Sequence, residues 1–333
     1  MSTRKRLRLL VRHFHENGLK FMLENPSNVR DLLQLLGVQL LPRIDFSHMR
    51  VVPGRFVGRD YRHLESDLVL QAPVQARPGS KQRQIVVYIL IEHQSEPDRF
   101  MPLRLLEYVV MIYKRQMRDW EKEHGNLDHL HLQPVLPIVL YTGTRTWNKL
   151  GAIWELVELG DELAERIPEL EPLFLNVGQT SRQVLEQQGG PFGLLLRLVQ
   201  QRRTRLPVFE QTLREVVRTL ETLAAEDRQR WLELLSHIAA LIYNEREEAE
   251  QEPLFEKVTD SVQNDAYRRE VFDMGKTIAE GLIEKGRLEG LEQGEVRTQR
   301  RVLVQVLRKK FGKLPAALVK RIEATEQLDL LKA

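Results

Sequence analysis

A nearly continuous apolar run covers Ile85–Ile91 and is rich in β-branched residues. It is too short to cross a membrane and predicts a central strand that is buried on both faces. The run ends in the polar residues Glu92–Glu96, after which Pro97 stops the strand. A buried strand that carries a carboxylate to its end indicates a functional site, because an ionised group there needs a partner or a metal.

A helix and several further strands are predicted around this central strand. Leu103, Leu106, Val110 and Tyr113 recur at helical spacing, which predicts a helix over 102–122. This helix lies between two predicted strands, an order that predicts a crossover connection and a parallel neighbour for the central strand. The predicted strands are 49–57 (interrupted by Pro53-Gly54), 67–74, 84–94, 135–141 and a short fifth at 173–177.

Helical periodicity dominates the two ends of the chain. Residues 1–41 predict two helices, the second starting at Pro26 and ending before Pro42-Arg43. Beyond Ser181 the pattern predicts helices over 192–201, 207–225, 227–248 and 252–284. The chain therefore predicts an α/β domain over 1–180, a helical region over 181–275, and a small helical C-terminal module over 276–333 that begins with a glycine-bearing linker helix.

The predicted linker helix at the start of the C-terminal module contains four glycines, at positions 281, 286, 290 and 294. Each glycine costs a helix about 1 kcal/mol, so the segment predicts a marginal helix or a hinge. Close helix–helix packing through the glycine face is the alternative. Gly312 is a plausible helix stop, and Pro315 a plausible start for the last helix.

Composition narrows the classes of function. With 333 residues the chain can bury a large core, and with no cysteine it has no disulfide, thiolate zinc site or cysteine nucleophile. No apolar run reaches the ~18–20 residues that span a bilayer, and the basic N-terminus lacks the pattern of a signal peptide. We therefore expect a protein that stays in the cytoplasm and does not bind membranes.

Charge gives only a weak indication of a partner. The net charge of +3 provides no strong field for a polyanion. Basic residues nevertheless cluster at Arg4–Arg12, Arg202–Arg205 and Arg297–Lys313. Such clusters suit either phosphate contacts or solvated helix faces.

Two carboxylates can be placed opposite each other by strand geometry. If the second and third strands form an antiparallel hairpin whose turn is centred between Gly79 and Ser80, Asp67 pairs with Glu92. Directly opposed β carbons lie about 5 Å apart, close enough for both carboxylates to hold one divalent cation. Gln94 shares a face with Glu92, whereas His93 points the other way.

This arrangement has two interpretations. Two close carboxylates and a polar side chain form an oxygen-rich site suited to Mg²⁺, which could polarise a phosphodiester and activate a water. Alternatively, Asp67 only begins a strand and Glu92 only ends one at the surface. In the loop before the fourth strand, His124, His129 and His131 could hold zinc or belong to a solvated polar loop.

One long block of the sequence runs through Tyr88–Ser95, Pro97-Asp98 and Met101–Tyr108. Two further blocks are Leu136–Gly143, followed by Trp147-Asn148, and His15–Lys20 near the start of the chain. Together these blocks resemble the Rpn family, the recombination-promoting nuclease and transposase-like group of bacterial proteins within the PD-(D/E)xK nuclease superfamily. In this resemblance Leu136–Gly143 corresponds to the next characteristic block of the family and His15–Lys20 to its opening motif.

The resemblance implies a restriction-endonuclease-like α/β core, with a mixed central sheet flanked by helices, and a metal-dependent DNA endonuclease activity that promotes recombination. By position, Asp67 and Glu92 match the acidic residues of the motif, and Glu16 matches a helix residue that can complete the metal shell. Gln94 stands where the motif has lysine, so it could position a water but supplies no charge. A DNA-binding protein that keeps the fold without cleaving is therefore the alternative.

The implied partners follow from this resemblance. Mg²⁺ is the expected cofactor, with Mn²⁺ as a possible substitute, and double-stranded DNA is the expected substrate, contacted by Arg104, Tyr108 and Lys20. For Arg104 and Tyr108, packing and ordinary surface roles are equally open. We also expect a homodimer, because two strands must be cut, and a location near the bacterial nucleoid.

Overall fold

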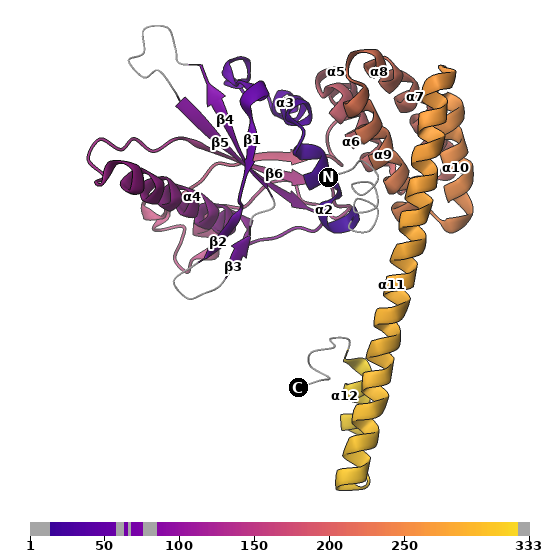
Figure 1. Cartoon of the computed structure of the whole chain (residues 1–333). Helices are drawn as coiled ribbons and strands as arrows, with labels where there is room; N and C mark the ends of the chain where they lie inside the picture. Colours follow the sequence, from indigo (N-terminus) through magenta and orange to yellow (C-terminus); the bar gives the residue numbers. More distant parts are fainter. Residues whose placement is uncertain (1–13, 58–62, 66–67, 76–84, 326–333) are drawn as a thin grey trace. The chain divides into compact units, whose positions relative to one another are not determined.

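The structure, a computed structural model, describes residues 14–57, 63–65, 68–75 and 85–325. At its centre is a five-stranded mixed sheet of order β1-β4-β5-β6-β7 (Figure 1). The strands are β1 (Arg50–Val52), β4 (Leu68–Val74), β5 (Ile85–Gln94), β6 (Val135–Tyr141) and β7 (Leu173–Asn176). Two further strands, β2 (Arg55–Val57) and β3 (His63–Glu65), form a separate antiparallel pair. The predicted α/β class is confirmed.

The pairing of the sheet follows the predicted pattern. Strands β4 and β5 are antiparallel, and their register joins Leu68 to Ile91 and Val74 to Ile85. This is the register that a turn centred between Gly79 and Ser80 requires. Strands β5 and β6 are parallel, as the intervening helix predicted. Strand β7 adds a second parallel pair beside β6.

Helix α4 (Met101–His124) packs on one face of the sheet. Its buried side chains share a core with Leu90 of β5 and with Val139 and Tyr141 of β6. Trp147 completes this core by edge-on contacts with the rings of Tyr141 and Phe174. Tyr141 and Trp147 therefore have packing roles in this core.

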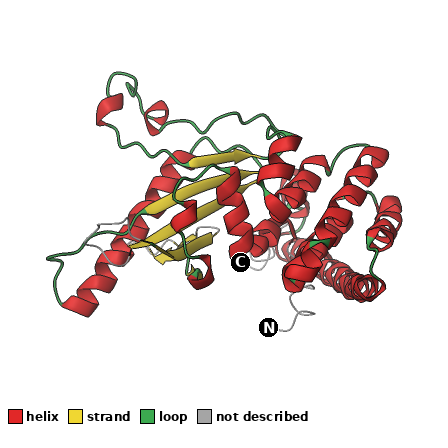
Figure 2. Ribbon diagram, turned by 90° about the horizontal axis from the view of Figure 1, so that it is seen from above, coloured by secondary structure: helices red, strands yellow, loops and turns green. Residues whose placement is uncertain are grey.

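The opposite face of the sheet is covered by helices that precede β1 and helices that follow β7 in the sequence (Figures 1 and 2). Helix α2 (Phe14–Leu23) packs on α9 (Arg228–Glu245), and α3 (Pro26–Leu35) packs on α6 (Gly190–Gln201). Hydrogen bonds in this region join residues about 160 to 210 positions apart in the sequence. Helix α3 begins where Pro26 predicted, with the Asn25 side chain as its N-cap, but it ends at Leu35 rather than at Pro42. The helices are α2 (Phe14–Leu23), α3 (Pro26–Leu35), α5 (Arg182–Gln188), α6 (Gly190–Gln201), α7 (Leu206–Glu221), α8 (Leu223–Glu226), α9 (Arg228–Glu245) and α10 (Glu248–Ser261). Short 3₁₀ turns cover Leu41–Arg43, Phe46–His48, Ile153–Leu156 and Ala164–Arg166.

The expected continuous helix over 252–284 is wrong, because the chain breaks between α10 and α11 (Asp265–Phe311). At the break, the carboxylate of Glu221 on α7 accepts hydrogen bonds from the backbone N–H groups of Gln263 and Asn264. The Asn264 side chain then accepts from the N–H of Ala266 and starts α11. A partner about forty residues away therefore sets this boundary.

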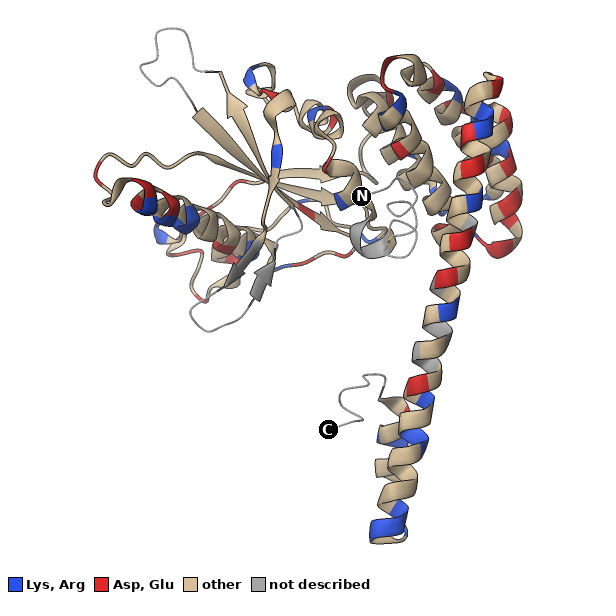
Figure 3. Cartoon of the chain, in the orientation of Figure 1, with Lys and Arg blue, Asp and Glu red and all other residues tan. Residues whose placement is uncertain are grey.

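Helix α11 continues through all four glycines of the linker, so no hinge interrupts it in this structure. Among the residues that the structure describes, nothing lies within 4 Å of a side chain built at Gly286 or Gly294, so these two glycines serve no close helix contact there. Gly312 ends the helix with a φ of +75°, and α12 (Ala316–Ala324) starts after Pro315, as predicted. The last turn of α11 is basic (Figure 3).

The chain divides into two compact units, one of residues 13–272 and one that includes residues 273–325. The sheet and the helices up to α10 belong to the first unit. Whether the predicted divisions near residues 180 and 275 separate independently folding domains stays a prediction. No helix in the described part of the chain is long and apolar enough to span a membrane.

Candidate active site

The last residues of β5 place a buried carboxylate on the α4 face of the sheet. Glu92 is only 1% exposed. Burying a carboxylate costs several kcal/mol unless a positive group and hydrogen bonds compensate. Arg104, in the first turn of α4, brings its Nη2 atom to 3.5 Å from Oε2 of Glu92. The structure therefore places two predicted site residues side by side.

Arg104 is held by a second acidic residue. Its Nη1 atom donates to Oδ2 of Asp98 at 2.8 Å, and Asp98 also accepts from the N–H of Phe100 at the start of α4. Burial lowers the pKa of Arg104, but hydrogen bonds with Tyr108 and Asp98 and the charge of Glu92 outweigh it and raise that pKa above its ordinary value. The guanidinium is thus a permanent positive charge beside Glu92.

Gln94 follows two residues later on the same strand and, by strand alternation, on the same face as Glu92. Its side chain is half-buried. Its carbonyl accepts a hydrogen bond from the N–H of Thr142, which ties the end of β5 to the residue after β6. At Gly143 a side chain would lie 2.1 Å from the carbonyl of Ser95, so this close approach of the two strand ends requires glycine.

The other predicted metal ligands cannot be placed. Asp67 lies outside the described residues, and the side chain of Glu16 in α2 is not described. Glu92 and Gln94 supply oxygen donors of the kind that Mg²⁺ prefers, so the described part of the site fits a hard divalent cation. Within the described residues, no three acidic or histidine side chains form a metal cluster, and this includes the predicted His124, His129 and His131.

The two other predicted DNA contacts differ from Arg104 in their positions. Tyr108 is 3% exposed and packs in the core beneath Arg104, which favours a packing role over the predicted DNA contact. Lys20 lies in the last turn of α2. Arg104, at 39% exposure, is accessible to solvent beside Glu92.

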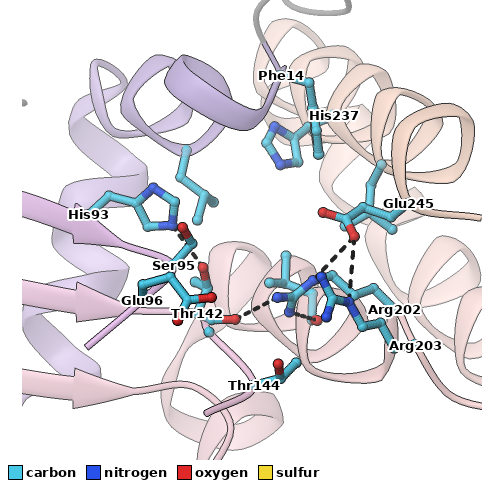
Figure 4. A pocket seen from close by; sticks show the side chains of 14 residues that line it. Phe14, His93, Ser95, Glu96, Thr142, Thr144, Arg202, Arg203, His237 and Glu245 are labelled. Atoms are coloured by element: carbon cyan, nitrogen blue, oxygen red, sulfur yellow. Dashed lines mark hydrogen bonds and ion pairs between the residues drawn. The ribbon is translucent and has the colours of Figure 1, made fainter. Parts of the chain in front are cut away.

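A second polar cluster lies on the other face of β5, in a cavity of about 230 Å³ between the strand ends and α2, α6 and α9 (Figure 4). His93 Nε2 lies 2.8 Å from Oγ1 of Thr142. Arg202 donates to the carbonyl of Thr142 at 2.7 Å and lies 3.6 Å from the Glu245 carboxylate. Because Arg202 is buried and paired, the Arg202–Arg205 cluster is not the uniformly exposed basic surface that its sequence suggests.

The histidines of this cavity are held neutral. Burial, followed by the charge of Arg202, lowers the pKa of His93 to about 4. Burial, followed by the proximity of His93, lowers the pKa of His237 to about 3. The Nδ1 atom of His237 has no hydrogen-bond partner among the described residues. Gly18 of α2 leaves room for the His237 ring, since a side chain there would lie 3.1 Å from it.

Sequence reasoning missed Asp98 and the cavity. Asp98 carries a local signal of a turn only, because an Asp side chain commonly accepts from the backbone N–H two residues on, as Asp98 does from Phe100. Its contact with Arg104, six residues later, has no such signal. The cavity carries none, because His237 and Glu245 lie about 140 residues or more after His93 and meet it only through packing.

Comparison with known proteins agrees with the sequence resemblance. Residues 13–231 match the family described as "Putative transposase, YhgA-like". The chain belongs to this family. It is 28% identical over 154 residues to the recombination-promoting nuclease RpnC of Escherichia coli K12, across 46% of this chain and 47% of RpnC. It is 29% identical over 153 residues to the recombination-promoting nuclease RpnD of E. coli O157:H7, across 46% of this chain and 54% of RpnD.

These matches confirm the predicted membership of the Rpn group, although the chain spans only about half the length of these two relatives. A further family relative, YjiP of E. coli K12, is described as an inactive recombination-promoting nuclease-like protein; it is 29% identical over 99 residues, across 29% of this chain and 90% of YjiP. No solved structure matches the chain.

Proposed function

We propose that this protein is a metal-dependent endonuclease that hydrolyses phosphodiester bonds of double-stranded DNA and thereby promotes recombination. The observation that carries the proposal is the buried Glu92 carboxylate at the end of β5, next to the partly exposed guanidinium of Arg104. A buried carboxylate beside a permanent cation suits phosphoryl chemistry, in which charged groups must be fixed before the substrate arrives. The names of the relatives RpnC and RpnD support the same activity.

In this proposal each motif residue has a role. Asp67 and Glu92 hold the cation, with Glu16 as a possible third ligand, and Gln94 orients the attacking water through its amide. A bound Mg²⁺, or Mn²⁺ in its place, would supply Lewis-acid polarisation of the phosphodiester and lower the pKa of the water. The water oxygen bonds to phosphorus as the bond to the leaving sugar oxygen breaks. The water gives up one proton, and the leaving oxygen takes up one.

The decisive experiment is cleavage of supercoiled plasmid in Mg²⁺, Mn²⁺ or EDTA by the wild type and by Asp67→Ala and Glu92→Gln. We expect cation-dependent nicking that falls at least about a hundredfold in both variants, because each removes a charge needed in the transition state. Glu92→Gln keeps the shape of the buried side chain, so its melting temperature serves as the folding control. Nicking by wild type that persists in EDTA, or in both variants, would refute the proposed site.

The second candidate function is a DNA-binding protein that keeps the fold without cleaving. Gln94 at the lysine position favours it, and so does the relative described as inactive. If the wild type binds DNA but does not nick it in any cation, this candidate replaces the first. A homodimer is proposed only on the need to cut two strands, and light scattering of the purified protein tests it.

A further inference from the structure

The structure offers a replacement for the positive charge that the motif lysine would supply. Gln94 is neutral, yet the phosphate gains negative charge as water attacks, and without a positive side chain in addition to the metal ion the site would stabilise that charge less well. Beside Glu92, Arg104 is such a cation. It comes from α4 rather than from β5, so motif spacing along the strand does not reveal it.

The contacts of Arg104 divide its guanidinium into a fixed side and a loose side. Nη1 lies 2.8 Å from Asp98, a normal charge-assisted hydrogen bond. Nη2 lies 3.5 Å from Glu92, at the limit of hydrogen bonding. Tyr108 supports the guanidinium from the core. The loose side can therefore turn from Glu92 to a phosphate oxygen while Asp98 and Tyr108 hold the group in place.

Exposure is consistent with this role. Glu92 is almost fully buried, whereas 39% of the Arg104 side chain is open to solvent. A phosphate that approaches this end of the strand meets the guanidinium first. Arginine also presents several donors in one plane, which matches the oxygens of a phosphate.

We propose that Arg104 replaces the motif lysine: it donates to a nonbridging oxygen of the scissile phosphate and stabilises the charge that develops during cleavage. Asp98 and Tyr108 are positioning residues for it. The inference rests on the proposed nuclease function. Without DNA, the same guanidinium partly neutralises Glu92 and so competes with a cation for that carboxylate.

The test removes the positive charge of Arg104 from α4 and then restores a positive charge at position 94 of β5. Plasmid nicking is compared for wild type, Arg104→Gln, Arg104→Lys and the double variant Arg104→Gln with Gln94→Lys. We expect Arg104→Gln to lower the nicking rate about 10²–10³-fold, the usual loss for one transition-state donor. Arg104→Lys should retain most of the rate, and the double variant should recover at least about tenfold over Arg104→Gln, because the lysine restores a charge near the phosphate.

Further measurements separate an effect on catalysis from effects on folding and on binding. DNA affinity, measured by anisotropy in Ca²⁺, should change far less than the rate, and the melting temperature shows whether each variant folds. Mn²⁺ affinity of the DNA-free protein, measured by calorimetry, should increase in Arg104→Gln, because a competing cation has left Glu92.

The outcomes distinguish the two proposals. If wild type nicks DNA but Arg104→Gln nicks as fast, or if the double variant recovers nothing, Arg104 does not replace the lysine and the nuclease assignment stands. If Arg104→Gln loses DNA binding as much as nicking, Arg104 is an ordinary DNA contact. If wild type does not nick DNA at all, the proposed function fails and this inference fails with it.

Discussion

The buried imidazole of His237 makes the stability of the larger unit depend on pH. The unfolded chain takes up a proton on this ring near its ordinary pKa of 6.5, whereas the folded ring does so only near 3. Between these values the unfolded state binds more protons, so stability is lost as the pH falls. His93, Arg202 and Arg203 oppose the incoming charge from the cavity wall, and Glu245 favours it.

The size of this effect follows from the shift. Each pKa unit corresponds to about 1.4 kcal/mol, so His237 alone should remove about 2 kcal/mol of unfolding free energy between pH 8 and pH 5. The loss should reach about 3 kcal/mol at pH 4, where the folded ring is still largely neutral. His93 titrates in the same window and adds to the slope of the wild type, but it is present in both proteins compared.

The assay is urea unfolding at pH 8, 7, 6 and 5, with the free energy of unfolding compared between wild type and His237→Gln. The variant should lose about 2 kcal/mol less than wild type over this range, whatever its stability at pH 8. Leu234→Ala, a buried change on the same helix that keeps the imidazole, should keep the wild-type slope. A ¹⁵N-histidine spectrum showing His237 protonated near pH 6 in the folded protein would refute the reasoning.

Two stability predictions concern the contact between α3 and the later helices. Arg230 pairs with Asp31 at 2.5 Å and donates to Asn28 at 2.9 Å inside the unit, so Arg230→Met should leave a buried carboxylate unpaired and cost about 3–5 kcal/mol in chemical unfolding; an unchanged transition midpoint would contradict this. Asn25 caps α3 and donates to Glu233 on α9, so Asn25→Ala should cost about 1 kcal/mol in the same measurement. Asn25→Ser, which keeps a cap oxygen and places no second negative charge beside Glu233, should cost less.

Much of the sheet was predictable because its signals are local. The strand over 135–141 appears at the predicted bounds, and the β4–β5 register follows from one turn. Alternation along β5 also correctly separated Glu92 from His93. These features depend on the two-residue period of a strand, which the sequence displays directly.

The missing parts depend on partners far along the chain. The break before α11 needs Glu221, and the cavity needs His237 and Glu245 to meet the end of β5. The place of Arg104 beside Glu92 depends on how α4 packs on the sheet, and helical periodicity gives only the buried face of α4. Propensity also failed for the glycine repeat, where four unfavourable residues did not end a helix of 47 residues.

Two consecutive residues of β5 lie on opposite faces of the sheet: Glu92 lies beside α4, and His93 lines the cavity on the other face. A backbone shift at the end of β5 therefore moves the candidate active site and the cavity together. Thr142 bonds to the Gln94 carbonyl through its N–H and to His93 through its hydroxyl, so the same shift also moves the residue that follows β6. Loss of activity in a mutational screen at His93 or Thr142 is thus poor support for a chemical role. At this position, the face on which a residue lies matters more than its distance along the sequence from the motif.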